Sequence, residues 1–196
     1  MPISRRDLTA GLFAAPVLLS PMRVAAAPAL PPTPACDDRP DPTPRATEGP
    51  FFTPLSPRRH DLAADVDRGE ALLVGGFVVG PACAPVAGAV VDVWQADHRG
   101  RYDNDGYRLR GHVETDAAGR WWFATVVPGR YPGRTRHIHV KVGPGKAGGT
   151  GRVLTTQLFF PGEPGNARDF LYDERLLLRM AGDGAERFGR FDFVLG

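Results

Sequence analysis

The segment from Gly129 to His139 holds a tyrosine, an arginine and a His-x-His pair within eleven residues. His137 and His139 lie in the run H-I-H-V-K-V, whose β-branched residues and alternation predict a strand. Side chains two apart on a strand point to the same face, about 6.7 Å apart at about 3.3 Å per residue. Two such imidazoles can lean together and share one zinc, copper or iron ion. The pair alone is better explained as two surface histidines, so the neighbouring residues must decide whether it binds a metal.

Two of the four tyrosines, Tyr102 and Tyr131, lie beside glycine turns next to these motifs. A phenolate is a hard anionic oxygen ligand, and two phenolates with two neutral imidazoles would cancel most of the charge on a trivalent iron. Taken singly, each tyrosine is better explained as a loop residue with its ring packed on the domain. The four residues together indicate a metal site.

These side chains need a framework of strands and turns. The 196 residues are 42% hydrophobic and 23% charged, a composition that predicts one well-buried domain. Twenty prolines and 24 glycines are dispersed between apolar runs and predict many turns. Six strand-like runs with short turns between them predict a mainly β protein, an antiparallel β-sandwich. The runs are residues 72–79, 88–96, 120–126, 137–142, 153–160 and 191–195.

Three further segments have recognisable patterns. Residues 28–44 form a proline-rich arm with little to bury, and residues 115–120 predict a tight turn that uses glycine for a left-handed position. Residues 166–181 carry leucines among good helix formers and predict one short helix late in the chain.

The first 27 residues match a twin-arginine export signal. Arg5 and Arg6 precede an apolar run at residues 10–19, and three alanines at residues 25–27 resemble a cleavage site. An ordinary secretory signal or a hydrophobic N-terminal helix is the alternative, and the run is too short to span a bilayer. We expect a periplasmic or secreted protein with a signal at 1–27, an arm and loop at 28–69 and a β-sandwich catalytic domain at 70–196.

The charge and cysteine content fit the same interpretation. The leader carries the chain's whole formal excess of +2, so we expect no nucleic-acid partner and, after signal removal, no membrane partner. Cys36 and Cys83 both lie in the exported portion beside turn-forming residues, which favours one disulfide in an oxidising compartment. Metal ligation by these cysteines lacks a supporting spacing, and two free thiols remain the other alternative.

An ordered set of motifs resembles the intradiol ring-cleavage dioxygenases, the family of the catechol, hydroxyquinol and protocatechuate dioxygenases. The motifs are V-D-V-W-Q-A-D-x-x-G-x-Y, L-R-G-x-x-x-T-D-x-x-G, P-G-R-Y-P-G-R-T-x-H-I-H-V and T-T-Q-L-F-F-P-G. The match covers nearly all of the chain after the signal. The resemblance implies a prealbumin-like sandwich and a non-haem Fe(III) held by Tyr102, Tyr131, His137 and His139.

The resemblance also implies catalytic roles. Tyr131 would be the axial tyrosinate that leaves when the catecholate binds. Arg134 would stabilise negative charge on the ring as oxygen attacks, since a guanidinium never deprotonates. Gln157 would orient the substrate or the intermediate. The T-E-G-P-F-F segment resembles a family segment that lines the active-site mouth, here with Pro50, Phe51 and Phe52.

The implied reaction cleaves a small aromatic diol with O2 to a muconate-type dicarboxylic acid. Only five residues separate Tyr131 from His137, fewer than in the cytoplasmic enzymes, and this short form resembles an exported branch. Arg136 stands where a small residue is common in the family and favours an anionic substrate or is simply exposed. The sequence leaves open which catechol is cleaved and whether the chain forms a homo-oligomer.

Two other functions use the same residues. A non-enzymatic prealbumin-like binding module explains the strands but leaves the tyrosines and histidines without a role. A periplasmic copper protein would use the His-x-His pair alone. The remaining histidines, for which we expect surface or structural roles, are His60, His98 and His112.

Overall fold

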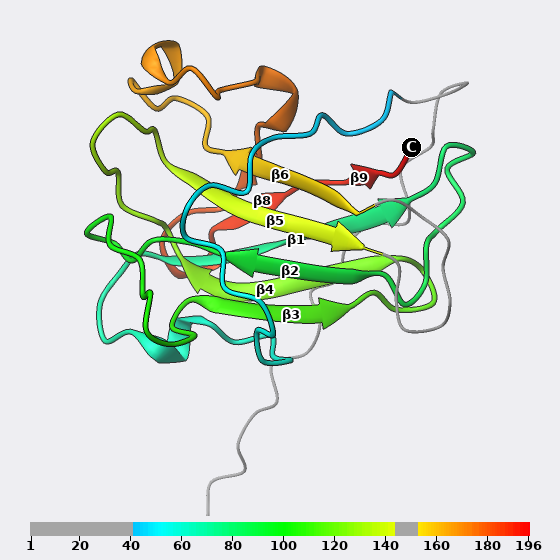
Figure 1. The fold of residues 1–196 in the computed structure, drawn as a ribbon, viewed down its shortest axis with the longest axis horizontal. Helices are drawn as coiled ribbons and strands as arrows, with labels where there is room; N and C mark the ends of the chain where they lie inside the picture. The colour runs from blue at the N-terminus through cyan, green and yellow to red at the C-terminus, as the bar shows by residue number, and fades with distance from the viewer. Residues whose placement is uncertain (1–40, 144–152) are drawn as a thin grey trace, which may run out of the picture.

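The computed structural model describes residues 41–143 and 153–196, which form two β-sheets packed face to face (Figure 1). The strands are β1 (Ala71–Val79), β2 (Val90–Trp94), β3 (Arg110–Glu114), β4 (Arg120–Val126), β5 (His137–Gly143), β6 (Leu154–Phe159), β7 (Arg179–Ala181), β8 (Phe188–Arg190) and β9 (Phe193–Val194). Short 3-10 helices lie at η1 (Ala63–Asp65), η2 (Asn166–Arg168), η3 (Glu174–Leu176) and η4 (Gly184–Glu186).

The first sheet has the order β3-β2-β5-β6, and the second has the order β4-β1-β8-β7 with β9 paired to β1. The predicted sandwich is therefore confirmed, and each of the six predicted runs contains a strand. Its pairing is not wholly antiparallel, because β8 and β9 both run parallel to β1. The strands that the pattern missed are β3, β7 and β8, which are short and rich in charged residues or glycine.

The alternation along β5 separates the core from the face that carries the candidate site. Ile138, Val140 and Val142 are buried in the core between the sheets. His137, His139 and Lys141 must therefore point the other way, since neighbouring side chains of a strand alternate between faces. We call this side of the first sheet the outer face.

The described part of the N-terminal arm covers the outer face. In Figure 1 the blue-to-cyan segment crosses in front of the first sheet. The Ala46 amide donates to the Thr155 carbonyl on β6, and the His112 amide on β3 donates to Pro57. Thr43 reaches the far end of the chain, where its amide donates to Val194. The signal and the first part of the proline-rich arm lie outside the described residues.

The predicted helix over residues 166–181 is wrong. The segment contains η2, η3 and then strand β7. Asp169 and Asp173 accept backbone N–H groups two residues ahead, which competes with helical hydrogen bonding. The Leu178 amide donates to Phe159 of β6 at 2.8 Å and ties the segment to the sandwich instead. Leucine spacing alone therefore misidentified an irregular segment.

The predicted turn at residues 115–120 is confirmed. Gly119 has a φ of 75°, and the Asp116 carboxylate accepts the amides of Ala118 and Arg120 at 2.9 Å. Cys83 carries no free thiol, while Cys36 lies outside the described residues, so their pairing stays a prediction. Within the described ranges, none of the helices has the length and apolar character needed to cross a bilayer.

Candidate metal centre

His137 and His139 stand side by side on the outer face, with their Nε2 atoms 3.2 Å apart. Nitrogen ligands at about 2.0–2.1 Å from one ion are roughly 3.0–3.4 Å apart for bond angles of about 90–110°. The observed separation fits two ligands of a single cation. The alternation of β5 therefore produces the arrangement that its sequence predicted.

The hydrogen bonds of His137 fix which nitrogen faces the site. Its Nδ1 lies 2.7 Å from the Thr135 carbonyl, which can only accept, so Nδ1 carries the proton. Nε2 is left with a lone pair, which is the state that binds a metal. His139 stacks on Trp94 with ring centroids 5.0 Å apart, and its Nδ1 is buried without a partner among the described residues.

Both imidazoles are held neutral. Burial, aided by the positive charge of Arg134, lowers the pKa of His137 from 6.5 to about 4. Burial, with the neighbouring His137 and Arg134, lowers the pKa of His139 well below its usual value. A neutral imidazole is the form that coordinates metal ions, so the site needs no proton release from these residues near neutral pH.

Tyr131 brings a phenol to the two histidines from the loop before β5. Its hydroxyl lies 3.3 Å from Nε2 of His137 and receives a hydrogen bond from Arg134, also at 3.3 Å. An isolated antiparallel β-bridge between the backbones of Tyr131 and Arg134 closes the turn, in which Gly133 has a φ of 80°. Burial raises the pKa of Tyr131, while the charge of Arg134 acts in the opposite direction.

Tyr102 approaches from the loop between β2 and β3. Its ring centroid is 5.8 Å from that of Tyr131 and 6.2 Å from that of His139. The hydroxyl is buried and makes no hydrogen bond of acceptable geometry to the described residues, even though the Tyr131 phenol is close. Burial, followed by the influence of Tyr131, raises its pKa far above the usual value. Such an orphaned polar atom needs an explanation, and a cation beside it supplies one.

The two tyrosine loops are locked together. The Asp97 carbonyl accepts the amide of Gly129 at 2.8 Å, and the Asp97 carboxylate accepts the amides of Arg99 and Arg101. Gly100 has a φ of 78°, and a Cβ at this position would collide with the carbonyl of Arg130. Glycine is therefore required here for Tyr102 and Tyr131 to approach one another.

Arg134 is fixed by two partners around the cluster. Its Nε donates to the Asp169 carboxylate at 2.9 and 3.1 Å, and its Nη2 donates to the amide oxygen of Gln157. The Arg134 and Asp169 side chains are only 11% and 1% exposed. Burial acts to raise the pKa of Asp169, but the amides of Thr135 and Leu171 and the Arg134 charge lower it overall. The guanidinium is thus held beside the Tyr131 hydroxyl.

The predicted aromatic mouth is divided between two places. Phe51 stacks on Tyr102, with ring centroids 4.4 Å apart, and forms one wall of the site. Phe52 instead packs on Trp94, and Lys141 lies 3.5 Å above its ring centroid. Pro50 is exposed in the turn before them. Of the three residues, Phe51 is the one that contacts a proposed ligand.

Sequence reasoning missed two residues around the site. Asp169 lies 35 residues from Arg134, with no local pattern to connect them. Arg110 occurs in the L-R-G motif but received no role. Its buried guanidinium donates to the carbonyls of Phe51 and Asp103 and lies 6.0 Å from the Tyr102 ring centroid. Arg110, whose hydrogen bonds within the described residues all go to backbone oxygens, therefore connects Phe51 to the loop that carries Tyr102.

Other predicted residues do not join the centre. Arg136 forms an ion pair with Glu163 at 3.4 Å, so its charge is partly neutralised. His60 stacks on Trp122, and His98 is half-buried on the loop next to Asp97. No group of three His, Cys, Asp or Glu side chains suited to a metal occurs in the described ranges. The tyrosine oxygens complete the donor set, which we call the tyrosine–histidine cluster (Tyr102, Tyr131, His137 and His139).

His112 belongs to a second polar group on the outer face, the serine clasp (Ser56, Asp92 and His112). The Ser56 hydroxyl donates to Asp92 at 2.8 Å, and Nδ1 of His112 lies 2.7 Å from the Ser56 carbonyl. The hydroxyl proton therefore goes to the carboxylate rather than to the imidazole, which leaves no activated nucleophile. The clasp fastens the arm to β2 and β3.

Comparisons with known proteins identify dioxygenases as relatives of this chain. A family model described as a dioxygenase matches residues 47–195. A catechol 1,2-dioxygenase of Acinetobacter lwoffii is 34% identical over 68% of this chain and 56% of its own length. The protocatechuate 3,4-dioxygenase beta chain of Burkholderia cepacia is 32% identical over 72% of this chain and 73% of its own.

A solved structure is more similar. The dioxygenase domain of a dioxygenase carbohydrate-binding protein fusion from Streptomyces sp. SirexAA-E is 50% identical, with a TM-score of 0.74. The alignment covers 79% of this chain and 98% of that domain. By contrast, the chain spans only about half the length of the catechol dioxygenases that it matches.

Proposed function

Because the chain belongs to the intradiol dioxygenase family, we propose that it cleaves the ring of a catechol-type diol with O2 at the tyrosine–histidine cluster. The observation that carries this proposal is the convergence of two neutral imidazoles and two phenols on one point of the outer face, where one phenol has no hydrogen bond to the part of the chain that the structure describes. The relatives include enzymes named for catechol and protocatechuate, which supports an aromatic diol as substrate.

The cluster suits Fe(III) as its metal. Two imidazole nitrogens and two phenolate oxygens would offset a high positive charge, and the phenols remain neutral only as long as no cation lies beside them. When bound, ferric iron would supply a Lewis acid that takes up both catechol oxygens and makes the ring reactive towards O2.

Tyr131 is placed to move a proton. It is half-buried, its hydroxyl lies at the edge of the cluster, and Arg134 already donates to its oxygen. As a phenolate it would accept the proton of an incoming catechol hydroxyl and turn away from the cluster. Tyr102 is held deeper, beneath Phe51, and is suited to remain in place.

Arg134 provides the fixed positive charge of the site. Asp169 and Gln157 hold the guanidinium in a single orientation beside the Tyr131 oxygen. Negative charge that builds up on the substrate ring as oxygen attacks would be stabilised by this preorganised cation. The Gln157 amide is itself oriented by a hydrogen bond to the Thr47 carbonyl at 3.0 Å, so the arm takes part in fixing the residues around the cluster.

The overall reaction balances without a further reductant. The bond between the two hydroxyl-bearing carbons breaks, and both atoms of O2 end in the product. A catechol and one O2 give one muconate-type dicarboxylic acid. Oxygen uptake matched one to one by dicarboxylate formation, measured over a panel of catechols, tests the proposal and identifies the preferred ring.

Replacing Tyr131 tests its ligand role. Tyr131→Phe should shift the visible charge-transfer band of the iron protein and slow ring cleavage strongly with the fold intact. Tyr107→Phe is the matched control, because that hydroxyl donates to the Pro54 carbonyl away from the cluster. An unchanged spectrum and turnover in Tyr131→Phe would refute the assignment.

Metal analysis separates the proposal from its alternatives. An iron(III)-tyrosinate protein is red to burgundy, whereas a copper protein or a metal-free binding module is not. Purified protein that contains copper instead of iron, or that binds iron but leaves every catechol intact, would overturn the dioxygenase proposal.

We also propose export through the twin-arginine route, which carries proteins that are already folded and would deliver the site with its metal in place. The motif at Arg5 and Arg6 supports this proposal. Replacing both arginines by lysine should leave the protein in the cytoplasmic fraction. Continued export of that variant would favour an ordinary secretory signal.

A further inference from the structure

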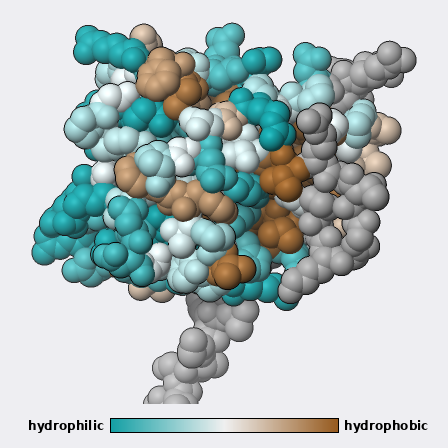
Figure 2. Space-filling view, viewed as in Figure 1, coloured by the Kyte–Doolittle hydropathy of each residue, from teal (hydrophilic) through white to brown (hydrophobic). Residues whose placement is uncertain are grey.

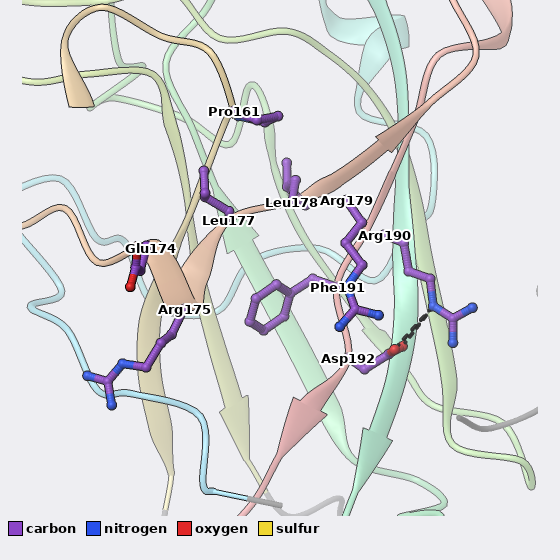
Figure 3. Close-up of a pocket in the computed structure, with 9 residues that line it drawn as sticks. All are labelled: Pro161, Glu174, Arg175, Leu177, Leu178, Arg179, Arg190, Phe191 and Asp192. Carbon is purple, nitrogen blue, oxygen red and sulfur yellow. Dashed lines mark hydrogen bonds and ion pairs between the residues drawn. The ribbon is translucent and has the colours of Figure 1, made fainter. Parts of the chain in front are cut away.

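A cavity of about 380 Å³ lies at strands β7 and β8 (Figure 3). Its volume falls within the range of about 300–1,000 Å³ that small-molecule sites occupy. None of its lining residues belongs to the cluster. They are Pro161, Glu174, Arg175, Leu177, Leu178, Arg179, Arg190, Phe191 and Asp192.

One end of this cavity carries surplus positive charge. Arg179 on β7 and Arg190 on β8 are directly opposite cross-strand partners, an arrangement of like charges that destabilises a sheet. Asp192 neutralises Nε of Arg190 at 3.1 Å, and its carboxylate also accepts the Phe77 amide. Arg179 makes no hydrogen bond or ion pair with any residue that the structure describes.

The middle of the cavity is apolar. Figure 3 shows the Phe191 ring between the Arg179 and Arg190 side chains on one side and Glu174 on the other. Leu177, Leu178 and Pro161 complete this wall. A planar ring placed against Phe191 would gain both apolar burial and an aromatic contact.

The other end offers a hydrogen-bond acceptor. Glu174 is exposed, and its carboxylate receives no hydrogen bond from the described residues. Arg175 beside it is already engaged, with three hydrogen bonds from its guanidinium to Asp173. The cavity thus has cationic donors at one end, an apolar wall and a carboxylate acceptor at the other.

We propose that this cavity binds a phenolic acid. The ligand's carboxylate pairs with Arg179 and the free Nη groups of Arg190, since guanidinium and carboxylate match in geometry as well as charge. Its ring packs on Phe191, and its hydroxyl donates to Glu174. Arg179 and Arg190 then bind the carboxylate together, and its negative charge relieves the repulsion between them. The site does not depend on the proposed ring cleavage.

The test uses para-hydroxybenzoate as the probe, since it lacks the paired hydroxyls that a catechol presents to a metal. Calorimetric titration of the full protein should show binding, and Arg179→Gln should weaken it about tenfold, the loss expected for charge-assisted hydrogen bonds. Arg179 is exposed, so the variant should fold normally. Arg120→Gln, which removes an exposed arginine paired with Asp116, is the charge-matched control and should bind like the wild type.

Two analogues test the two ends of the cavity. Phenol, without the carboxylate, and benzoate, without the hydroxyl, should each bind more weakly than para-hydroxybenzoate. Glu174→Ala should abolish the preference for para-hydroxybenzoate over benzoate. The proposal is overturned if the wild type does not bind the probe, or if Arg179→Gln binds it as tightly as the wild type does.

Catechol turnover in the same variants keeps this site separate from the metal centre. Arg179→Gln should consume O2 with catechol at the wild-type rate while it loses para-hydroxybenzoate binding. Loss of probe binding in Tyr131→Phe, with retention in Arg179→Gln, would place the probe at the metal centre and overturn the proposal.

Discussion

The tyrosine–histidine cluster and the serine clasp lie on the same outer face of one sheet, two residues apart along β2. Trp94 pairs with His139, and Asp92 pairs with His112. Both groups contain imidazoles and hydroxyls, yet their hydrogen bonding differs. In the clasp the hydroxyl proton and the imidazole proton each meet an acceptor. In the cluster, two Nε2 atoms face one another, and the buried Tyr102 hydroxyl has no hydrogen bond to any residue in the described ranges.

This difference shows that residue type alone does not make a site. Figure 2 shows this side of the molecule with polar and apolar side chains mixed across it. What distinguishes the cluster is that two imidazole Nε2 atoms lie together beside a buried phenol oxygen with no hydrogen bond to the described residues, a situation that a cation resolves. In the serine clasp the same kinds of side chain have their hydrogen-bond donors paired, and they hold the arm in place.

The largest expected difference between the two groups concerns metal binding. His139→Ala should abolish iron binding and reduce oxygen uptake with catechol to background, because it removes one of two neutral nitrogen ligands. His112→Ala should retain iron and turnover and lose about 1 kcal/mol of stability. Metal content and oxygen uptake, measured on both variants, check this contrast. Full iron content in His139→Ala would show that the cluster does not bind iron through His139 and would contradict this prediction.

The second prediction concerns buried carboxylates. Asp169→Asn should destabilise the protein by about 3 kcal/mol in urea denaturation, because it leaves the Arg134 charge buried without its partner. It should also lower kcat by about tenfold, as expected when a partner that orients an active group is lost. Asp92→Asn should leave kcat unchanged, since the clasp does not contact the cluster. A lower kcat in Asp92→Asn would show that the serine clasp influences the tyrosine–histidine cluster and would contradict this prediction.

The third prediction is that the two groups respond to pH in opposite ways in the metal-free protein. The pKa of His137 falls from 6.5 to about 4 on folding, so the unfolded chain binds more protons in that window. Stability should therefore drop by about 3 kcal/mol as the pH falls from 6.5 to 4.

Asp92 has the opposite sign. Burial, partly offset by the Ser56 hydrogen bond, raises its pKa above the usual 3.8, so its contribution is lost as the pH rises through the folded value. Asp92→Asn should remove this loss, and His137→Gln should reduce the acid-side drop to the part that His139 contributes. Denaturation curves across the pH range measure how the free energy of unfolding depends on pH. If either variant kept the pH dependence of the wild type, the opposite responses of the two groups would be contradicted.

The smallest expected effect is that of the clasp hydroxyl. Ser56→Ala should cost about 1 kcal/mol, the typical net value of one hydrogen bond, and leave iron content and turnover unchanged. Thermal unfolding together with oxygen uptake measures both. A loss of turnover in Ser56→Ala would show that the clasp belongs to the active site.

The sequence pattern predicted what depends on short-range periodicity. The alternation of β5 places His137 and His139 on one face because neighbouring strand residues alternate, and the structure agrees. The motif order correctly identified the family. The role of Asp169 could not be predicted, since its contact with Arg134 depends on how two loops 35 residues apart meet. The helix prediction failed because side-chain hydrogen bonds, which leucine spacing does not report, redirect the backbone.

The arm across the outer face has a consequence for the order of synthesis. Thr47 and Ala46 leave the ribosome before their partners on β6, which follow more than a hundred residues later, and Val194, the partner of Thr43, follows it by 151 residues. The Gln157 amide can be oriented by the arm only after both segments exist. A nascent chain that stops before β6 therefore lacks Gln157 and the mature shape of the site, so metal loading should follow translation rather than accompany it.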